Sequence, residues 1–103
     1  MKLPSQSRID GATWQVASIP RYREESGDYG RTTNHDLTMR IDTSVAPAVI
    51  RDVLLHEHLH AMSMVRLSVE DQLTERQVAG LSGCLLQWLR TNHNLLDFLM
   101  EKE

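Results

Sequence analysis

Residues 36–65 change their hydrophobic period part-way along, and this change constrains the fold more than any other feature. In "HDLTMRID" the side chains of Leu37, Met39 and Ile41 alternate with polar ones. Strict alternation places apolar residues on one face of an extended chain, which is typical of a half-buried strand. We therefore expect a strand here that pairs with an earlier one.

From residue 43 onward the apolar residues recur at helical spacing. Pro47 is compatible with a helix only near its start, where the missing N–H breaks no helical hydrogen bond. We expect a helix over about residues 45–65, with Thr43 or Ser44 as its N-cap.

The remaining elements are predicted from shorter signals. "ATWQVASI" follows the turn-prone pair Asp10-Gly11 and predicts a first strand over about 12–19. The polar, glycine-containing residues 20–34 predict a long loop or an irregular hairpin connection. These two strands suggest a small antiparallel sheet or hairpin.

Two more helices are expected after the first. "TERQ" has the form of a capping box with Thr74 as N-cap, and the apolar spacing behind it predicts a helix over about 75–90. "LLDFLM" predicts a short terminal helix, which either folds back over the core or exposes an apolar patch suited to a partner or a second copy. The expected fold is α+β, as one domain over residues 1–103.

Composition excludes several classes of partner. The net charge of -3 and the pI of about 5.9 argue against a phosphate-binding surface, so we expect no nucleic-acid partner. No apolar run reaches the roughly 18 residues of a membrane span, and the N-terminus has no apolar signal-peptide region. A single cysteine allows no internal disulfide, so we expect a cytoplasmic protein.

The first helix carries the strongest chemical signal, the His-Glu-x-x-His pattern of His56, Glu57 and His60. Residues four apart lie about 40° apart around a helix, so both imidazoles can reach one ion, and zinc accepts such nitrogen ligands. Glu57 lies about 100° round from His56, where it can act as general base toward a water near that ion. His58 points to the opposite side of the helix and cannot share the ion.

Chance is a poor explanation for this pattern. With five histidines and seven glutamates in the chain, shuffling gives on the order of 0.01 occurrences. The pattern also lies in an apolar stripe, where a carboxylate is costly unless something compensates its charge. A buried histidine and glutamate satisfied by neighbouring hydrogen bonds is the alternative.

A catalytic zinc site usually has three protein ligands, so a third is needed. The acids after the helix are Glu70, Asp71 and Glu75. Glu75 is favoured because it opens the second helix, although ideal helices would leave it about 8–10 Å along the axis from His60. An oblique crossing or an early end of the first helix would close that gap. Glu70 and Asp71 remain alternatives.

The runs "MRID", "LLHEHLHAM" and "LTERQVAGLSGCLLQWLRTNHNLLDFL" together resemble the small zincin-like metallopeptidase proteins of phages and prophages. The resemblance covers roughly residues 36–99. It implies a minimal zincin-like fold, His56, His60 and Glu75 as Zn²⁺ ligands, and Glu57 as catalytic base. Two departures are "TNHN", which replaces an Asp-Asn-Pro type of break, and the small residues of "AGLSGC".

The sequence therefore leads to one hypothesis and two alternatives. The first is a zinc metallopeptidase that acts on a peptide or protein, with "HDLTMRID" as the strand that pairs with an extended substrate. The second is a catalytically inactive, zinc-stabilised protein-binding module, suggested by the small size of the chain. The third is a helical interaction module without metal.

Overall fold

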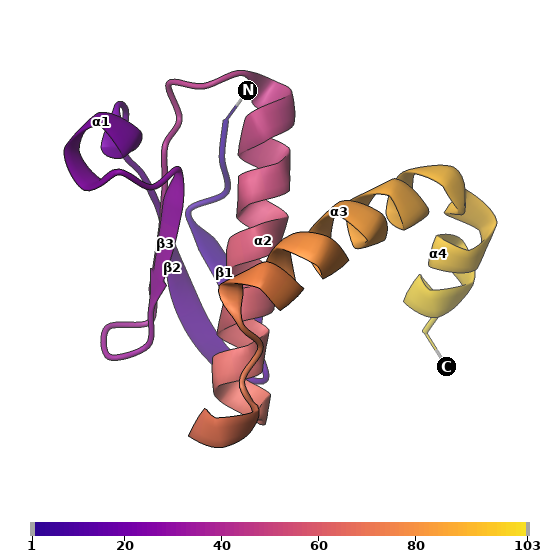
Figure 1. Cartoon of the computed structure of the whole chain (residues 1–103). Helices are drawn as coiled ribbons and strands as arrows, with labels where there is room; N and C mark the ends of the chain where they lie inside the picture. The colour runs from indigo at the N-terminus through magenta and orange to yellow at the C-terminus, as the bar shows by residue number, and fades with distance from the viewer. Residues whose placement is uncertain (1, 103) are drawn as a thin grey trace.

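The computed structural model describes residues 2–102, and its elements form three layers (Figure 1). A sheet covers one side of the long helix α2, and α3 crosses the other side before the chain turns into α4. The elements in chain order are β1 (Gln6–Ile9), β2 (Ala12–Ser18), α1 (Tyr22–Ser26), β3 (Gly30–Thr33), β4 (Thr38–Ile41), α2 (Pro47–Arg66), the 3₁₀ turn η1 (Val69–Asp71), α3 (Glu75–Thr91) and α4 (His93–Met100).

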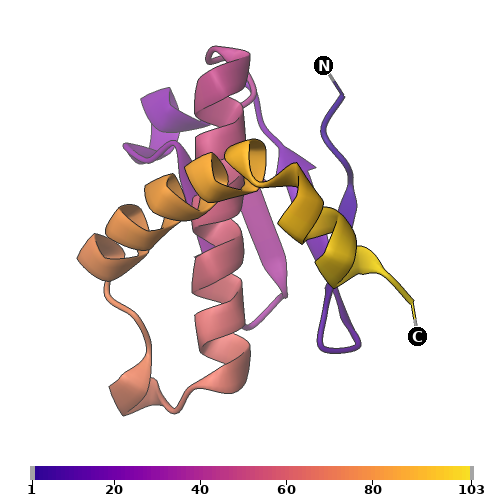
Figure 2. The ribbon, with the colours of Figure 1, turned by 90° about the vertical axis from the view of Figure 1, so that its right-hand side faces the viewer.

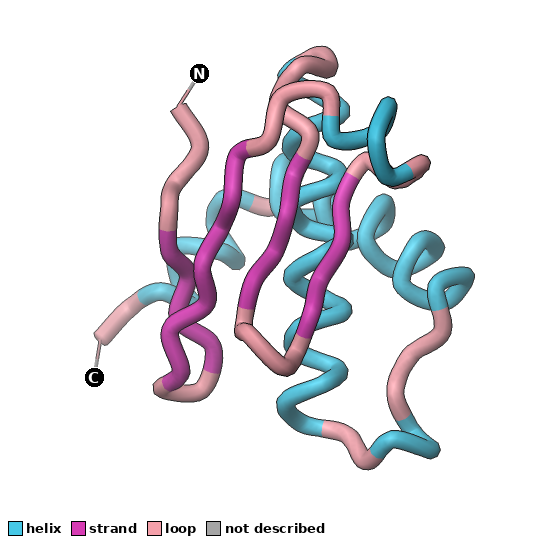
Figure 3. Tube along the Cα trace, turned by 90° about the vertical axis from the view of Figure 1, so that its left-hand side faces the viewer, coloured by secondary structure: helices cyan, strands magenta, loops and turns pink. Residues whose placement is uncertain are grey.

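The sheet is mixed rather than antiparallel, which corrects the prediction from the sequence. Its strand order is β1-β2-β4-β3, with β2 and β4 parallel and the other neighbours antiparallel (Figure 3). After β2 the chain forms β3 at the edge of the sheet. It then turns back and forms β4, which lies between β2 and β3. The α+β class is as predicted.

This order gives β4 a partner on each side. Its backbone hydrogen bonds are therefore used within the sheet, and the prediction that "HDLTMRID" pairs with a substrate is wrong. The edge strands are β1 and β3, and β3 is the one that contacts α2 at Glu57.

The first hairpin turns at Asp10 and Gly11, which have φ angles of 51° and 81°. Two successive positive φ values match the twist of a tight hairpin and favour a sequence such as Asp-Gly. The strand β2 lies where the sequence predicted a strand, over about residues 12–19. The strand β1 was not predicted, because its four residues, QSRI, carry little hydrophobic pattern.

Residues 20–34 are not a plain loop, contrary to the prediction, because they contain α1 and β3. Asp42 holds α1 in place. The residue is 2% exposed, and its carboxylate accepts hydrogen bonds from the backbone N–H of Arg23 at 2.9 Å and of Ser44 at 2.8 Å. One side chain thus ties α1 to the loop that leads into α2.

The core lies between the sheet and α2, in two groups of buried residues. One group joins strand residues to Ala61, in the later half of α2: Ile9, Trp14, Met39 and Ala61. The other joins strand residues to Ile50, in the first turn of α2: Val16, Ile41 and Ile50. Met39 and Ile41 are fully buried, as the alternation predicted. Leu37 lies instead in the turn before β4, with a φ of 49°, and Asp42, expected on the polar side, is 2% exposed.

The start of α2 differs from its prediction in the capping residue. Ala46 occupies the N-cap and offers no side-chain hydrogen bond, while Pro47 begins the helix. Thr43 and Ser44 lie too early in the chain to cap it. Ser44 instead donates its hydroxyl to Asp42 at 2.6 Å.

The helix α3 has the predicted capping box, in which Thr74 and Gln77 exchange hydrogen bonds at 2.9 and 3.1 Å. It crosses α2 obliquely (Figure 2). The connector after Arg66 folds back along α2, where the backbone N–H of Leu73 donates to Ser63 at 2.7 Å. Within residues 2–102, no helix is both long and apolar enough to cross a membrane.

Candidate metal centre

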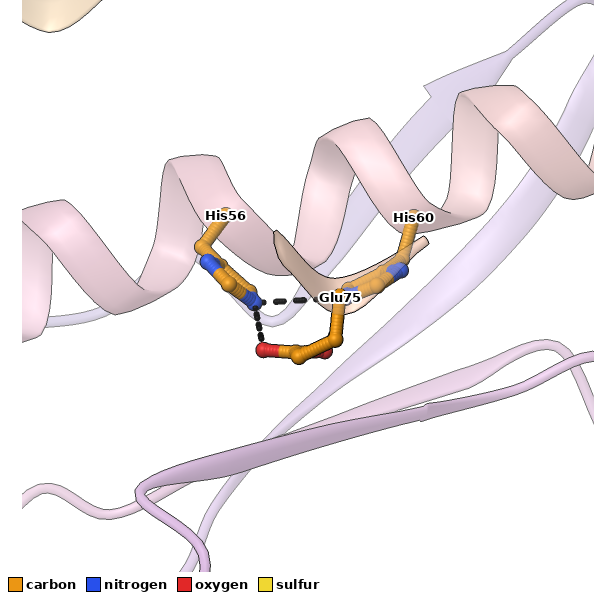
Figure 4. Close-up of side chains that lie close together, drawn as sticks. All are labelled: His56, His60 and Glu75. Atoms are coloured by element: carbon orange, nitrogen blue, oxygen red, sulfur yellow. Dashed lines mark hydrogen bonds and ion pairs between the residues drawn. The ribbon is translucent and has the colours of Figure 1, made fainter. Parts of the chain in front are cut away.

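Two successive turns of α2 direct His56 and His60 toward the same point (Figure 4). Their Nε2 atoms lie 3.2 Å apart, and the ring planes are inclined by 66°. The side chains of both residues are more than four-fifths buried. The spacing of four residues therefore brings the two imidazoles together, as expected from the sequence.

Glu75, the first residue of α3, completes the group. Its two carboxylate oxygens lie 2.6 Å from Nε2 of His56 and 2.7 Å from Nε2 of His60. The gap expected along the helix axis between Glu75 and His60 is absent. The connector folds back along α2, and α3 crosses α2 obliquely, as seen in Figure 2. Among the described residues, these three form the group of His, Cys, Asp and Glu side chains whose ligand atoms could share one ion.

Glu70 and Asp71, the alternative third ligands, lie in η1 and are outside this group. Asp71 accepts a hydrogen bond from Ser68 at 2.9 Å. Asp71 therefore interacts within the connector, and neither acid joins the two histidines.

The distance between the two nitrogens suits a shared divalent cation, while the distances from Glu75 to each imidazole are those of hydrogen bonds. If both imidazoles donate from Nε2 to Glu75, two N–H groups face each other across the 3.2 Å that separate His56 and His60. An ion removes this conflict because all three groups then present lone pairs. Tetrahedral zinc with bonds of about 2.0–2.1 Å separates its ligands by about 3.3 Å. This matches the 3.2 Å between the nitrogens, and the oxygens of Glu75, at 2.6 and 2.7 Å from them, would move slightly outward around an ion.

Glu57 lies beside this centre and beneath the edge strand. Glu57 is 5% exposed, and its Oε1 accepts a hydrogen bond from the Thr32 hydroxyl at 2.6 Å. The other oxygen, Oε2, lies 4.0 Å from Nε2 of His56. One oxygen is thus held by β3 while the other faces the centre.

Burial raises the pKa of Glu57 above its ordinary value. The hydrogen bond from Thr32 and the nearby imidazoles of His56 and His60 act in the opposite direction and offset only part of this effect. A carboxylate whose proton affinity is raised, and which has one free oxygen, is suited to accept a proton.

Gly30 allows β3 to approach α2 this closely. A Cβ atom built at Gly30 would lie 2.7 Å from Cγ1 of Val53 and 3.0 Å from Cγ of Glu57. A Cβ atom at this position would therefore require Val53, Glu57 or β3 itself to shift. The glycine favours the close contact in which Thr32 reaches Glu57.

His58 takes no part in the centre. Its Nδ1 lies 2.8 Å from the carbonyl oxygen of Leu54, and its Nε2 lies 2.8 Å from the hydroxyl of Ser7. It faces β1, on the side of α2 away from His56 and His60, as its position on the helix predicts.

Two hollows flank the centre, and Gly30, Glu57 and Glu75 line both of them. The hollow that reaches His56 has a volume of about 310 Å³ and extends to Tyr29. The hollow that reaches His60 has a volume of about 370 Å³ and extends along Thr32. Each is near the lower end of the range for ligand pockets, roughly 300–1,000 Å³. Together they form a cleft along β3.

The sequence did not indicate that residues of β3 line the hollows beside the centre. The run "GRTT" contains two β-branched residues, which favour a strand, but four residues are too few for a clear period. Gly30 and Thr32 could have been found only from the pairing of β3 with β4, which places them over α2.

Comparison with models of protein families, with curated proteins and with solved structures gave no match. The resemblance to small zincin-like proteins therefore stays a prediction from the motifs of the sequence.

Proposed function

We propose that the chain is a zinc-dependent metallopeptidase that hydrolyses a peptide bond. The observation that carries the proposal is the convergence of His56, His60 and Glu75 within 4.8 Å, with the buried carboxylate of Glu57 beside them. Together with the long helix and the adjacent edge strand, this arrangement supports a minimal zincin-like fold. It also agrees with the resemblance to small phage and prophage proteins.

The residues divide into two roles. His56, His60 and Glu75 would hold the ion, which supplies Lewis acidity and lowers the pKa of water at the site to about 7. Glu57 would take the proton from the attacking water through Oε2, since Oε1 is engaged by Thr32.

The substrate would lie as an extended strand along β3. This strand is at the edge of the sheet, and the hollows on either side of the centre run beside it. Backbone pairing at a sheet edge gives affinity for an extended chain with little dependence on its side chains. A peptide or a flexible protein segment is therefore the substrate class that we propose.

The test is hydrolysis by the zinc-loaded chain and by Glu57→Gln, with labelled casein and a mixed peptide library as probes. The amide keeps the shape of the carboxylate and cannot accept the proton, so we expect cleavage by the wild type alone, while both proteins bind zinc equally. Cleavage by Glu57→Gln would contradict the role of Glu57.

One observation favours a second function, a zinc-stabilised protein-binding module without turnover. The centre joins α2 to α3 through Glu75, so a bound ion would fix the two helices together. This alternative predicts zinc binding and a large stabilisation but no cleavage of either probe by the zinc-loaded wild type.

A further inference from the structure

The hollow beside His56 has an acidic wall. Its volume is about 310 Å³, at the lower end of the range for ligand pockets, so it is large enough for one long side chain. The acidic residues that line it are Asp28, Asp52, Glu57 and Glu75, and no Lys or Arg of residues 2–102 lines it. Carboxylates that gather in a cleft attract a positively charged group.

Three of these carboxylates already face a positive group or an imidazole. Asp28 pairs with Arg31 at 2.7 Å. Glu75 lies against both imidazoles of the centre, and Glu57 lies 4.0 Å from Nε2 of His56. The two positive charges of a zinc ion at the centre would offset Glu57 and Glu75. These three carboxylates therefore do not need a cation from the substrate.

Asp52 is the carboxylate that remains. It lies on α2 one turn before His56, about 6 Å along the helix axis, and it forms no ion pair or side-chain hydrogen bond within residues 2–102. It is also outside the group that could hold one ion, so a second metal ion is not the occupant that we infer. Arg23 contacts the ring of Tyr29 at 4.8 Å but is not part of the wall. The charge of Asp52 is thus available to a ligand.

Glu57 gives independent evidence that a polar ligand enters this hollow. The residue is 5% exposed, yet its Oε2 accepts no hydrogen bond within residues 2–102, while Oε1 is held by Thr32. A buried carboxylate oxygen without a donor is costly, so we expect groups that donate hydrogen bonds in the hollow when the site is occupied. The attacking water and the substrate bring such donors.

We propose that this hollow binds the side chain of a lysine or arginine of the substrate, and that Asp52 determines this preference. The inference rests on the proposed function for the position of the substrate along β3. The long apolar stem of the basic side chain would pack on Val53 and on the ring of Tyr29, which also line the hollow. Its charged end would reach Asp52.

The hollow beside His60 has a different wall. It shares Asp28, Glu57 and Glu75 with the first hollow, but Arg31 and Met64 line it and Asp52 does not. The positive charge of Arg31 makes this side less favourable for a second cation. The preference for a basic residue therefore belongs to one side of the bond that is cut.

The experiment measures the affinity of short Ala–Ser peptides that carry a single central lysine, norleucine or glutamate. Norleucine has the stem of lysine without the charge. The protein is the zinc-loaded Glu57→Gln chain, which should not cleave the peptides during the measurement. We expect the lysine peptide to bind about 10-fold more tightly than the norleucine peptide, the effect of one hydrogen bond between charged groups, and the glutamate peptide to bind most weakly.

Adding Asp52→Asn should abolish the difference between lysine and norleucine, because the amide keeps the shape of the carboxylate without its charge. The matched control is Asp97→Asn, which makes the same change of charge on α4, outside the hollow, and should keep the difference. Equal affinity for the three peptides would overturn the proposal. An equal loss of the preference in both variants would also overturn it, because the effect would then come from net charge.

Hydrolysis by the zinc-loaded wild type is measured separately, so the two proposals can fail separately. A preference for lysine in binding, without cleavage of any peptide, would uphold the role of the hollow and contradict the peptidase. Cleavage of all three peptides without a preference in binding would do the opposite. The comparison of the peptides with Asp52 in place decides even if an Asp52 variant does not fold.

Discussion

At the scale of single residues, Thr32 connects the edge strand β3 to Glu57, the proposed general base. Its hydroxyl donates to Oε1 of Glu57 at 2.6 Å, while Oε2 lies 4.0 Å from Nε2 of His56. In the proposed reaction Thr32 is a positioning residue, because it contacts Glu57 rather than the substrate.

We predict that Thr32→Val reduces hydrolysis about 10- to 100-fold, the range observed when a side chain that orients an active-site group is lost. Valine keeps the β-branched shape, so KM should change little while kcat falls. Thr32→Ser, which retains the hydroxyl, is the control and should keep most of the activity. A loss of the same size in both variants would show that the hydroxyl is not what matters.

Asp42 gives a residue-scale prediction about pH. Hydrogen bonds from the Ser44 side chain and from the backbone of Arg23 lower the pKa of Asp42 below its ordinary 3.8. The unfolded chain therefore takes up this proton at a higher pH than the folded chain. The resulting stabilisation is complete above about pH 4 and is lost as the pH falls further.

We expect Asp42→Asn to lower the urea midpoint of unfolding near neutral pH, because the amide accepts fewer hydrogen bonds than the carboxylate. The difference from the wild type should shrink as the pH falls below about 4. A difference that stays constant down to acid pH would argue against the ionised form as the source of the stability.

The residues of the centre could be predicted to different extents. The spacing of His56 and His60 within one helix follows from the sequence, because helix geometry is regular. Glu75 could be favoured but not chosen, because its position depends on how the connector folds back. Thr32 and Gly30 lie on a strand whose place in the sheet is determined by long-range pairing, so no local pattern indicated them.

At the scale of elements, the close contact of β3 with α2 depends on Gly30. We predict that Gly30→Ala destabilises the chain by about 1–3 kcal/mol, because the added Cβ overlaps Val53 and the carbon chain of Glu57. The same displacement would move Thr32 away from Glu57. Chemical denaturation measures the first effect.

Gly83→Ala is the matched control, since a Cβ at this exposed position of α3 meets no atom within 4 Å. Alanine also favours a helix more than glycine does, so this variant should be slightly more stable than the wild type. Equal stability of Gly30→Ala and the wild type would mean that β3 does not need its close approach.

The elements differ in how strongly their sequence determines them. The start of α3 was predictable because Thr74 and Gln77 form a local capping box. The strand β4 was predictable because its two apolar residues, Met39 and Ile41, continue an alternation that begins at Leu37, in the turn before the strand. In contrast, β1, α1 and β3 are four or five residues long and form through contacts with distant segments, such as those of Asp42 with α1.

At the scale of the whole molecule, the centre links the sheet-and-α2 body to the arm formed by α3 and α4. Glu75 approaches both histidines from the first turn of α3, so a bound ion holds the base of the arm on α2. Loss of the ion should loosen this junction.

We therefore predict that a chelator lowers the melting temperature of the zinc-loaded chain by on the order of 10–20 °C. Zinc at roughly 100 times its dissociation constant adds about 3 kcal/mol to stability, and each kcal/mol is worth about 4–8 °C in a domain of this size. Differential scanning calorimetry before and after chelation measures the shift. The chelator should leave the melting temperature of His56→Ala unchanged, since that variant should hold no ion.

The most direct test of the account is the zinc content of chain purified without added metal, measured by elemental analysis. We predict about one equivalent per chain in the wild type and in the control His58→Ala, whose side chain faces β1. His56→Ala and His60→Ala should contain almost none. A wild type without stoichiometric metal, or equal metal in all four proteins, would contradict the claim that His56, His60 and Glu75 hold one ion.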